Sequence, residues 1–302
     1  MGKKIDKEVI IWYTGLVKSL LKAVILSTLL LYLSCAGIPV GEGEVHPSVW
    51  TKVEEGVELF QHTEKGSGVS VHALKIDLAN SRREVVVSKG IGSAGNVRDG
   101  KNKFISTTVV RFIKNEELLA AINGTPFDPY RFFPGLKQRA AGIVISKGVR
   151  YSNPEHYSAI FFTDNNRAVV LDPPFPESDT YPNGVGGFFT ILRDGEISAR
   201  ESGRDIRSVA GTDSSGNILY LAVIDRKLSF LSSSSRRGVT FREAARWMKI
   251  LGADDALLLD GGGSSILALR ENGTDKVHIL NRPEGGSLLF FKRIAPVFLG
   301  IR

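Results

Sequence analysis

The segment DGGGSS at 260–265 places a carboxylate, three residues without side chains and two hydroxyls in direct succession. The apolar run at 256–259 precedes it and is typical of a short strand that is covered on both faces. Glycines at such a position let a ligand approach the backbone and leave N–H groups available to an anion. A tight glycine turn between two strands is the alternative, but the carboxylate at the strand end favours a site. Its predicted residues are Asp260, Gly261, Gly262, Gly263 and Ser264.

The residues before this loop predict a helix that positions it. Thr240 and Glu243 fit a capping box, in which a hydroxyl and a carboxylate three residues later satisfy backbone N–H groups at a helix start. Gly252 is typical of a helix end. Apolar residues recur between them at helical spacing, at Ala244, Ala245, Trp247, Met248 and Leu251. The predicted order is therefore helix, tight turn, buried strand and then the carboxylate.

A second segment repeats this order. Ser106 or Thr107 can cap a helix over 109–113, and 118–122 predicts a strand. Asn123 and Gly124 follow as a strong turn pair. Since each motif follows an apolar strand preceded by a helix, we expect adjacent strands to place Asn123 and Asp260 in one pocket.

The loop after Asn123 carries a second carboxylate, Asp128, between Pro126 and Pro129. A plain turn would be the simplest interpretation of this loop. Aromatic residues around Asp128 favour a loop that faces a ligand instead, and they are Phe127, Tyr130, Phe132 and Phe133.

Together these segments resemble the phosphodiester glycosidase family. The resemblance lies in AAINGTPFDP at 120–129, FREAARWMKILGADDALLLDGGGSS at 241–265 and IRSVAG at 206–211. Weaker support comes from AAGIVISKG at 140–148, FFTILRDG at 188–195 and NRPEGG at 281–286, with Arg293 beyond. The resemblance runs from about residue 59 to the C-terminus. It implies a β-rich twisted core and a hydrolase that cleaves a sugar from a phosphate.

The chain departs from the family pattern at three places. Thr125 and the residues up to Asp128 stand where the family has a second glycine and an aromatic pair. Ser208 follows Arg207 where the family has threonine, and Lys292 precedes Arg293 where it has glutamate. The first departure supports a rival function, a non-catalytic glycan-binding lipoprotein that retains the fold.

Glycosidases usually use two carboxylic acids. Phosphate is a good leaving group, so the resemblance implies mainly stabilisation of an oxocarbenium-like centre and of the departing anion. Asp260 suits the first task. The backbone of 261–264, with Gly124, Arg207 and Arg293, suits the second.

Several of these roles have alternatives. Asn123 and Asp128 complete the expected catalytic group, and Asp225 is another candidate for the second carboxylate. Arg207 could instead form a surface or fold-supporting ion pair, and Arg293 could be a structural partner of Asp260.

Other enzyme classes lack their motifs. No GxSxG occurs for a serine hydrolase, and the glycines are not followed by the lysine of a P-loop. The five histidines share no metal-binding spacing, so no histidine-built zinc site is expected. We predict no cofactor, and the sequence leaves a divalent metal open.

The N-terminus predicts export. Lysines precede the apolar run 23–33, and Cys35, the only cysteine, stands at its exit within YLSCA. This segment resembles a bacterial lipobox, in which the cysteine is lipidated. An uncleaved membrane helix over 9–33 and simple secretion are the alternatives. Each places the protein outside the cytoplasm, so we expect an extracytoplasmic protein held at the membrane.

Charge and hydrophobic pattern limit the possible partners and fold class of the rest of the chain. The formal net charge is +7, of which five lysines against one aspartate and one glutamate contribute +3 within the first 34 residues. The remaining excess is scattered, so nucleic-acid binding is not expected. Short alternating strands dominate and convincing helices are few, which predicts an α+β fold with a mixed, twisted sheet. We divide the chain into a signal peptide or anchor at 1–34, a tether at 35–58 and one domain at 59–302.

Overall fold

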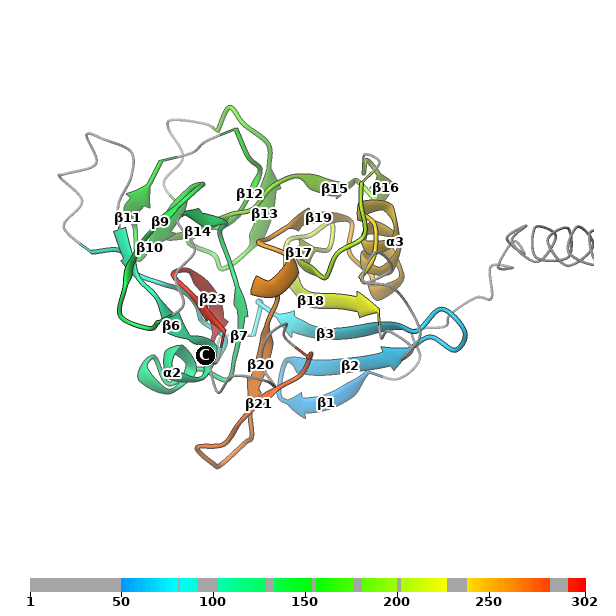
Figure 1. Cartoon of the computed structure of the whole chain (residues 1–302), viewed down its shortest axis with the longest axis horizontal. Helices are drawn as coiled ribbons and strands as arrows, with labels where there is room; N and C mark the ends of the chain where they lie inside the picture. The colour runs from blue at the N-terminus through cyan, green and yellow to red at the C-terminus, as the bar shows by residue number, and fades with distance from the viewer. Residues whose placement is uncertain are drawn as a thin grey trace, which may run out of the picture. The chain divides into compact units, whose positions relative to one another are not determined.

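The computed structural model divides the chain into two units, Met1–Val45 and His46–Arg302. The residues that it describes all lie in the second unit (Figure 1). They are 50–80, 82–91, 103–128, 133–153, 156–175, 181–199, 202–226, 238–282 and 293–302.

The largest sheet has eight strands in the order β1-β2-β3-β18-β17-β19-β15-β16. Their bounds are β1 Thr51–Glu54, β2 Val57–Thr63, β3 Val69–Asp77, β15 Thr190–Arg193, β16 Glu196–Ile197, β17 Arg207–Thr212, β18 Ile218–Arg226 and β19 Asp255–Leu258. Strands β17 and β19 are buried almost throughout, because they lie at the centre of this sheet. Their burial explains why 256–259 is continuously apolar.

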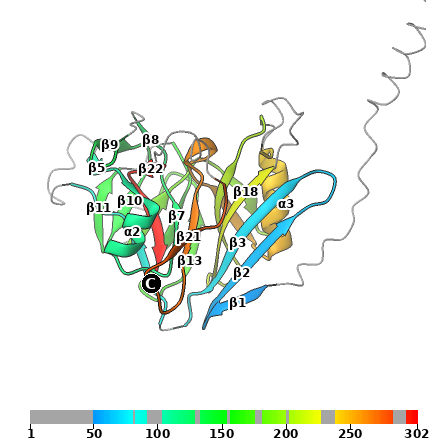
Figure 2. The same cartoon turned by 60° about the horizontal axis from the view of Figure 1, so that its bottom comes forward.

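Two five-stranded sheets pack beside it (Figure 2). The first has the order β11-β10-β14-β12-β13, with β10 Val144–Ser146, β11 Val149–Ser152, β12 Ala159–Phe162, β13 Ala168–Leu171 and β14 Asn183–Gly186. The second has the order β21-β20-β7-β23-β4, with β4 Val85–Val87, β7 Ala120–Asn123, β20 Leu267–Arg270, β21 Val277–Ile279 and β23 Phe298–Ile301.

Two smaller sheets complete the strand structure. One joins β5 Lys103–Ile105, β9 Lys137–Ala140 and β8 Phe127–Asp128. The other pairs β6 Thr107–Thr108 with β22 Ile294–Ala295.

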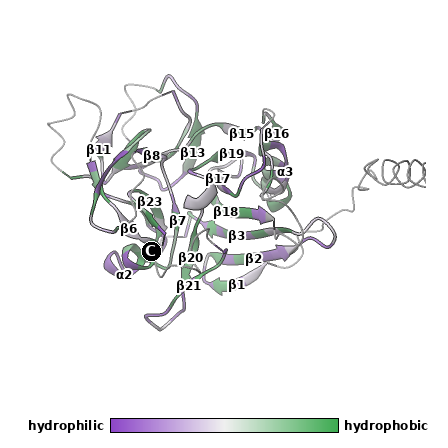
Figure 3. Cartoon of the chain, viewed as in Figure 1, coloured by the Kyte–Doolittle hydropathy of each residue, from purple (hydrophilic) through white to green (hydrophobic). Residues whose placement is uncertain are grey.

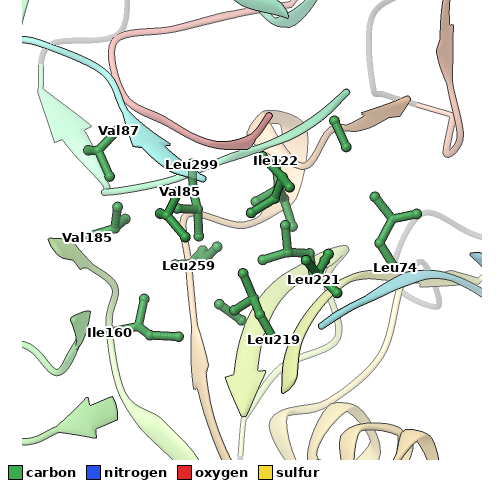
Figure 4. Packing of buried hydrophobic residues seen from close by; sticks show 14 of the residues in the cluster. Leu74, Val85, Val87, Ile122, Ile160, Val185, Leu219, Leu221, Leu259 and Leu299 are labelled. Carbon is green, nitrogen blue, oxygen red and sulfur yellow. The ribbon is translucent and has the colours of Figure 1, made fainter. Parts of the chain in front are cut away.

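The main core lies where the three large sheets face one another (Figure 4). Leu74 and Leu221 come from the eight-stranded sheet, Ile122 and Leu299 from the sheet that contains β7, and Ile160 from the sheet that contains β12. All five side chains are fully buried. In Figure 3 strands β18 and β20 are hydrophobic along much of their length, whereas the helices carry both colours, as amphipathic helices do.

Helix α3 (Phe241–Leu251) packs on the face of the eight-stranded sheet opposite this core. Thr240 and Glu243 form the expected capping box, and Gly252 ends the helix with φ 104°. The helix packs closely on the sheet at Gly211, because a Cβ atom at this position would lie only 2.9 Å from the Met248 methyl carbon. The predicted local structure before Asp260 is therefore confirmed.

Helix α2 (Val109–Asn115) packs against the sheet that contains β7, and the rings of Phe112 and Phe298 stack at 5.3 Å. Its N-cap is Thr108, rather than the predicted Ser106 or Thr107. Residues 107–108 first pair with β22, so the helix starts later than its sequence pattern suggested.

The α+β class is confirmed, with two corrections. Every strand pairing among the described residues is antiparallel, so these sheets are not mixed. The tether assigned to 35–58 extends too far, because Thr51–Glu54 and the start of β2 already belong to the largest sheet.

Candidate active site

The glycine loop, residues 260–265, leaves the end of β19 and turns sharply. Its residues 262–264 form a single 3₁₀ turn, η3 (Gly262–Ser264). Gly262 has φ +58°, and a Cβ atom there would lie 3.0 Å from an Asp205 carboxylate oxygen. A Cβ atom on Gly261 would lie 3.0 Å from the Ile206 carbonyl oxygen. The glycines are therefore required because the loop lies directly against the segment before β17.

The loop uses much of its own backbone hydrogen-bonding capacity. The Gly262 N–H donates to the Ile206 carbonyl at 2.8 Å, and the Ser264 N–H donates to the Gly261 carbonyl at 3.2 Å. The expectation of a run of free N–H groups over 261–264 is thus wrong for these two residues. The described contacts give no such protein partner to the N–H of Gly263.

Asp260 lies partly buried at the start of this loop. Its carboxylate accepts hydrogen bonds from the Ser264 side chain and from the Gly261 N–H. Burial raises the pKa of Asp260 to about 6, and the charge of Asp205 adds to this, whereas the hydrogen bonds and the charge of Arg293 oppose it. A carboxyl group with a pKa near 6 can act as a general acid or base close to neutral pH.

Asn123 contacts Asp260 directly, but through the backbone carbonyl of Asp260 and not through its carboxylate. Its Nδ2 donates to the Asp260 carbonyl oxygen at 2.6 Å. Its Oδ1 accepts from the Ser208 hydroxyl at 2.8 Å and from the Ile266 N–H at 3.0 Å. The side chain is fully buried, so the predicted catalytic role is corrected to a positioning role.

Gly124 is also a structural residue. Its carbonyl accepts from the Asp260 N–H at 3.0 Å, and its own N–H donates to the Val297 carbonyl at 2.9 Å. A Cβ atom would lie 3.0 Å from a Val185 methyl carbon. Glycine is therefore needed for packing here, and the predicted role in binding substrate is corrected.

The predicted rim of adjacent strands is wrong, although the two motifs do meet. β7 belongs to the sheet with β20 and β23, whereas β19 lies in the eight-stranded sheet. Asn123 therefore reaches Asp260 across the core between two sheets.

Two arginines lie against the glycine loop. Arg293 donates from Nη2 to the Ser264 hydroxyl at 2.7 Å, which links its charge to the Asp260 carboxylate. Arg207 Nη1 lies 3.9 Å from the position that a Gly261 Cβ would take. Arg293 therefore acts on the Asp260 carboxylate through Ser264, whereas Arg207 lies beside the backbone of Gly261.

Arg207 is held rigidly. Its Nε donates to the Val239 carbonyl at 3.1 Å, and its Nη2 donates to the Gly203 carbonyl at 2.6 Å. The guanidinium carbon lies 4.5 Å from the centre of the Phe241 ring. Burial lowers the pKa of Arg207, and the charge of Asp205 opposes this. The guanidinium is therefore fixed beside the loop rather than extended into solvent, as the surface ion-pair interpretation would require.

A family model for phosphodiester glycosidases matches residues 116–302. The chain belongs to the phosphodiester glycosidase family. The match includes the glycine loop, both arginines and Asn123, and it confirms the resemblance found in the sequence.

Solved structures support the same fold. The catalytic domain of zebrafish N-acetylglucosamine-1-phosphodiester α-N-acetylglucosaminidase, auto-inhibited by its pro-peptide, matches with a TM-score of 0.58 and 20% identity over 82% of each chain. A hypothetical protein from Synechocystis matches with a TM-score of 0.58 and 14% identity, over 82% of this chain and 62% of the other. A putative exported protein from Burkholderia pseudomallei matches with a TM-score of 0.50 and 14% identity, over 77% and 74%. Among curated proteins no match was found.

The two carboxylates expected to assist Asp260 lie on β8 and β18, not on the glycine loop. Asp128 forms an ion pair with Arg139 at 2.6 Å, and 63% of its side chain is exposed. Asp225 lies on β18 opposite Ser70 of β3. Among the described contacts, none joins Asp128 to the glycine loop.

Asp205 is the nearby carboxylate that sequence analysis missed. One of its oxygens accepts the Ile206 N–H at 2.8 Å, and the other faces Gly262. Its negative charge favours a higher pKa for both Asp260 and Arg207. Asp205 stands two residues before Arg207, directly before the resembling segment 206–211, and this position was the available signal.

Some predictions fall outside the residues described here. Cys35 and the apolar run before it do so, as do Tyr130, Phe132 and residues 283–286. No helix within the described ranges has the length and apolar character to cross a membrane. Within the same ranges no group of three His, Cys, Asp or Glu side chains could hold a metal ion.

Proposed function

We propose that this chain is a hydrolase that cleaves the bond between a sugar and a phosphate in a sugar phosphodiester. One observation carries the proposal. Asp260, whose pKa is raised to about 6, is linked through Ser264 to Arg293, and Arg207 lies beside Gly261 of the same glycine loop. A carboxylate and two cations on one loop fit a substrate that becomes positive at the sugar and releases an anion.

The reaction requires both charges at once. As the bond between the anomeric carbon and the phosphate oxygen breaks, its electron pair leaves with the phosphate. A water oxygen then bonds to the anomeric carbon and gives up one proton to a carboxylate. Arg207 and Arg293 suit the departing phosphate, and the ionised Asp260 suits the positive sugar carbon.

Asp205 is our choice for the second carboxylate in place of Asp128. It lies against the same glycine loop as Asp260, and its charge contributes to the raised pKa of Asp260. Such a pair can divide the tasks of nucleophile and proton acceptor, as in other glycosidases.

The N-terminal sequence supports a location outside the cytoplasm. Cys35 at the exit of a lysine-flanked apolar run supports a lipid-anchored protein, and an uncleaved helix is the alternative. An anchored glycosidase of this kind would act on a phosphodiester-linked glycan of the cell envelope.

The test uses the full chain in detergent and nitrophenyl diesters of hexose 1-phosphates. Turnover should release free hexose and nitrophenyl phosphate. In water enriched in oxygen-18 the label should enter the sugar, because the carbon–oxygen bond breaks. Label found in the phosphate would contradict the proposed bond cleavage.

Variants separate catalysis from binding. Asp260→Asn keeps the shape and removes the charge, so turnover should fall by a factor of about 10³ or more while diester binding survives. Asp128→Asn is the matched control and should retain activity. Binding of the diesters without turnover by the unmodified chain would favour the rival glycan-binding lipoprotein.

A further inference from the structure

A cavity of about 500 Å³ lies at the edge of the eight-stranded sheet beside α3. Residues that precede or belong to β12, β15 and α3 line it, together with residues that follow β13 and β16. Its volume falls within the range of 300–1,000 Å³ that is typical of small-molecule sites. None of its lining residues belongs to the glycine loop.

One wall of this cavity is aromatic. Phe189 lines the cavity and is 40% exposed. Its ring lies 5.9 Å from Tyr157 and 6.4 Å from Phe241, so neighbouring rings hold it in place. A fixed, exposed ring offers a flat apolar surface against which the C–H face of a sugar can pack.

The other wall is polar and fixed. Asp172 Oδ1 accepts hydrogen bonds of 2.5 Å from the hydroxyls of Ser158 and Thr190, and its Oδ2 accepts from Arg193 Nη2 at 3.0 Å. Burial favours a higher pKa for Asp172, but these hydrogen bonds and the charge of Arg193 hold the pKa below its usual value. An ionised carboxylate accepts hydrogen bonds only, and about half of this side chain remains exposed to receive a ligand hydroxyl.

Phe241 connects this cavity to the candidate active site. It lines the cavity, and the guanidinium of Arg207 lies 4.5 Å from its ring centre. Arg207 in turn lies beside Gly261. One aromatic ring and one guanidinium group therefore separate the cavity from the glycine loop.

We propose that the cavity lined by Phe189 and Asp172 binds a neutral pyranose ring, which is a second sugar of the phosphodiester substrate. An aromatic ring opposite a fixed acceptor matches a pyranose, which has a C–H face and hydroxyl edges. The assignment of this ring to the substrate rests on the proposed function, whereas binding of the ring itself does not.

The binding test uses the full chain in detergent and four probes, the methyl pyranosides of glucose, galactose, mannose and N-acetylglucosamine. Saturation-transfer NMR and titration should show that at least one binds in the millimolar range. Phe189→Ala and Asp172→Asn should each weaken that binding by about tenfold. Phe189→Trp should retain it, because the flat surface remains.

Matched controls lie away from the cavity. Ile105→Ala removes another exposed apolar side chain, and Asp213→Asn alters another carboxylate held by a serine hydroxyl. Both should leave pyranoside affinity within about twofold. Melting curves should confirm that each variant is folded.

The outcomes distinguish this proposal from the proposed function. Asp260→Asn should bind the pyranoside as the unmodified chain does, even if no diester is ever turned over. A diester that carries a second sugar should show a raised KM in Phe189→Ala, whereas one with a short alkyl group should not. The cavity is not a sugar site if none of the probes binds, or if Asp260→Asn weakens binding and Phe189→Ala does not.

Discussion

The side-chain amide of Asn123 donates a hydrogen bond of 2.6 Å to the carbonyl oxygen of Asp260, although 137 residues separate them in the chain. The same amide accepts from the Ser208 hydroxyl and the Ile266 N–H, so it joins β7, β17 and the residues after the glycine loop. A single buried polar group thus fixes the backbone that carries the candidate catalytic carboxylate.

Asn123→Ala should lower the free energy of unfolding by about 3 kcal/mol, because it leaves buried partners unsatisfied. Turnover should fall as well, since the loop loses its support. Denaturant unfolding and steady-state kinetics measure the two effects. Asn272→Ala, on the exposed turn after β20, is the control and should change stability by no more than about 0.5 kcal/mol. Unchanged stability in Asn123→Ala would refute the positioning role.

Local features of this fold could be predicted from sequence because neighbouring residues determine them. The capping box at Thr240, the left-handed Gly252 and the buried strand before Asp260 all follow from side-chain chemistry within a few residues. The start of α2 was misplaced because β22, far along the chain, pairs with residues 107–108.

The pairing of distant segments could not be predicted in the same way. Asp205 reaches the glycine loop because β17 pairs with β19 in the register Val209↔Leu258, which brings the Ile206 carbonyl to the Gly262 N–H. Alternation within each strand does not specify that register. Asp260 and Arg207 could therefore be predicted from the sequence, but Asp205, whose charge acts on both, could not.

Asp260 should make the folded chain less stable as pH rises. Its pKa is about 6 in the folded protein and 3.8 as an ordinary aspartate, so the folded state binds more protons between these values. Stability from this group is present below pH 3.8 and is lost as pH rises through 6. The free energy of unfolding of Asp260→Asn, relative to that of the unmodified chain, should therefore be higher at pH 8 than at pH 3.5, by on the order of 1–3 kcal/mol.

Denaturant unfolding of both proteins at the two pH values measures this gain. Asp128→Asn, at an exposed ion pair, should show no comparable gain on raising the pH. If Asp260→Asn is equally destabilised at both pH values, the ionised carboxylate of Asp260 does not destabilise the folded state.

Asp205→Asn should lower the pKa of Asp260. Burial is the main cause of the raised value and remains in the variant, but the repulsion from Asp205 is lost. The pKa should therefore fall from about 6 while staying above 3.8. NMR titration of carbon-13-labelled aspartate carboxyl groups measures this directly. Asp213→Asn, in the turn between β17 and β18, is the control, and a pKa of Asp260 that stays the same or rises in Asp205→Asn would contradict the proposed pair.

Cys35→Ser should abolish lipid attachment. A lipidated chain partitions into detergent and incorporates a fatty-acid probe, and Cys35 is the only cysteine available. Metabolic labelling of cells that express the full chain tests this, with Ser34→Ala as the neighbouring control that should remain labelled. Label that persists in Cys35→Ser would exclude Cys35 as the lipidation site, and an unmodified chain without label would favour an uncleaved helix or simple secretion.

Arg207→Lys should weaken phosphate binding although the charge is kept. The guanidinium uses Nε and Nη2 to hold backbone carbonyls of Val239 and Gly203, which leaves its Nη1 edge beside Gly261. A lysine ammonium cannot keep these contacts and present a donor to phosphate at the same time. Titration with inorganic phosphate should show an affinity lower by about tenfold or more. Arg242→Lys, exposed on α3, should bind phosphate as the unmodified chain does, and equal affinity in both variants would remove Arg207 from the phosphate site.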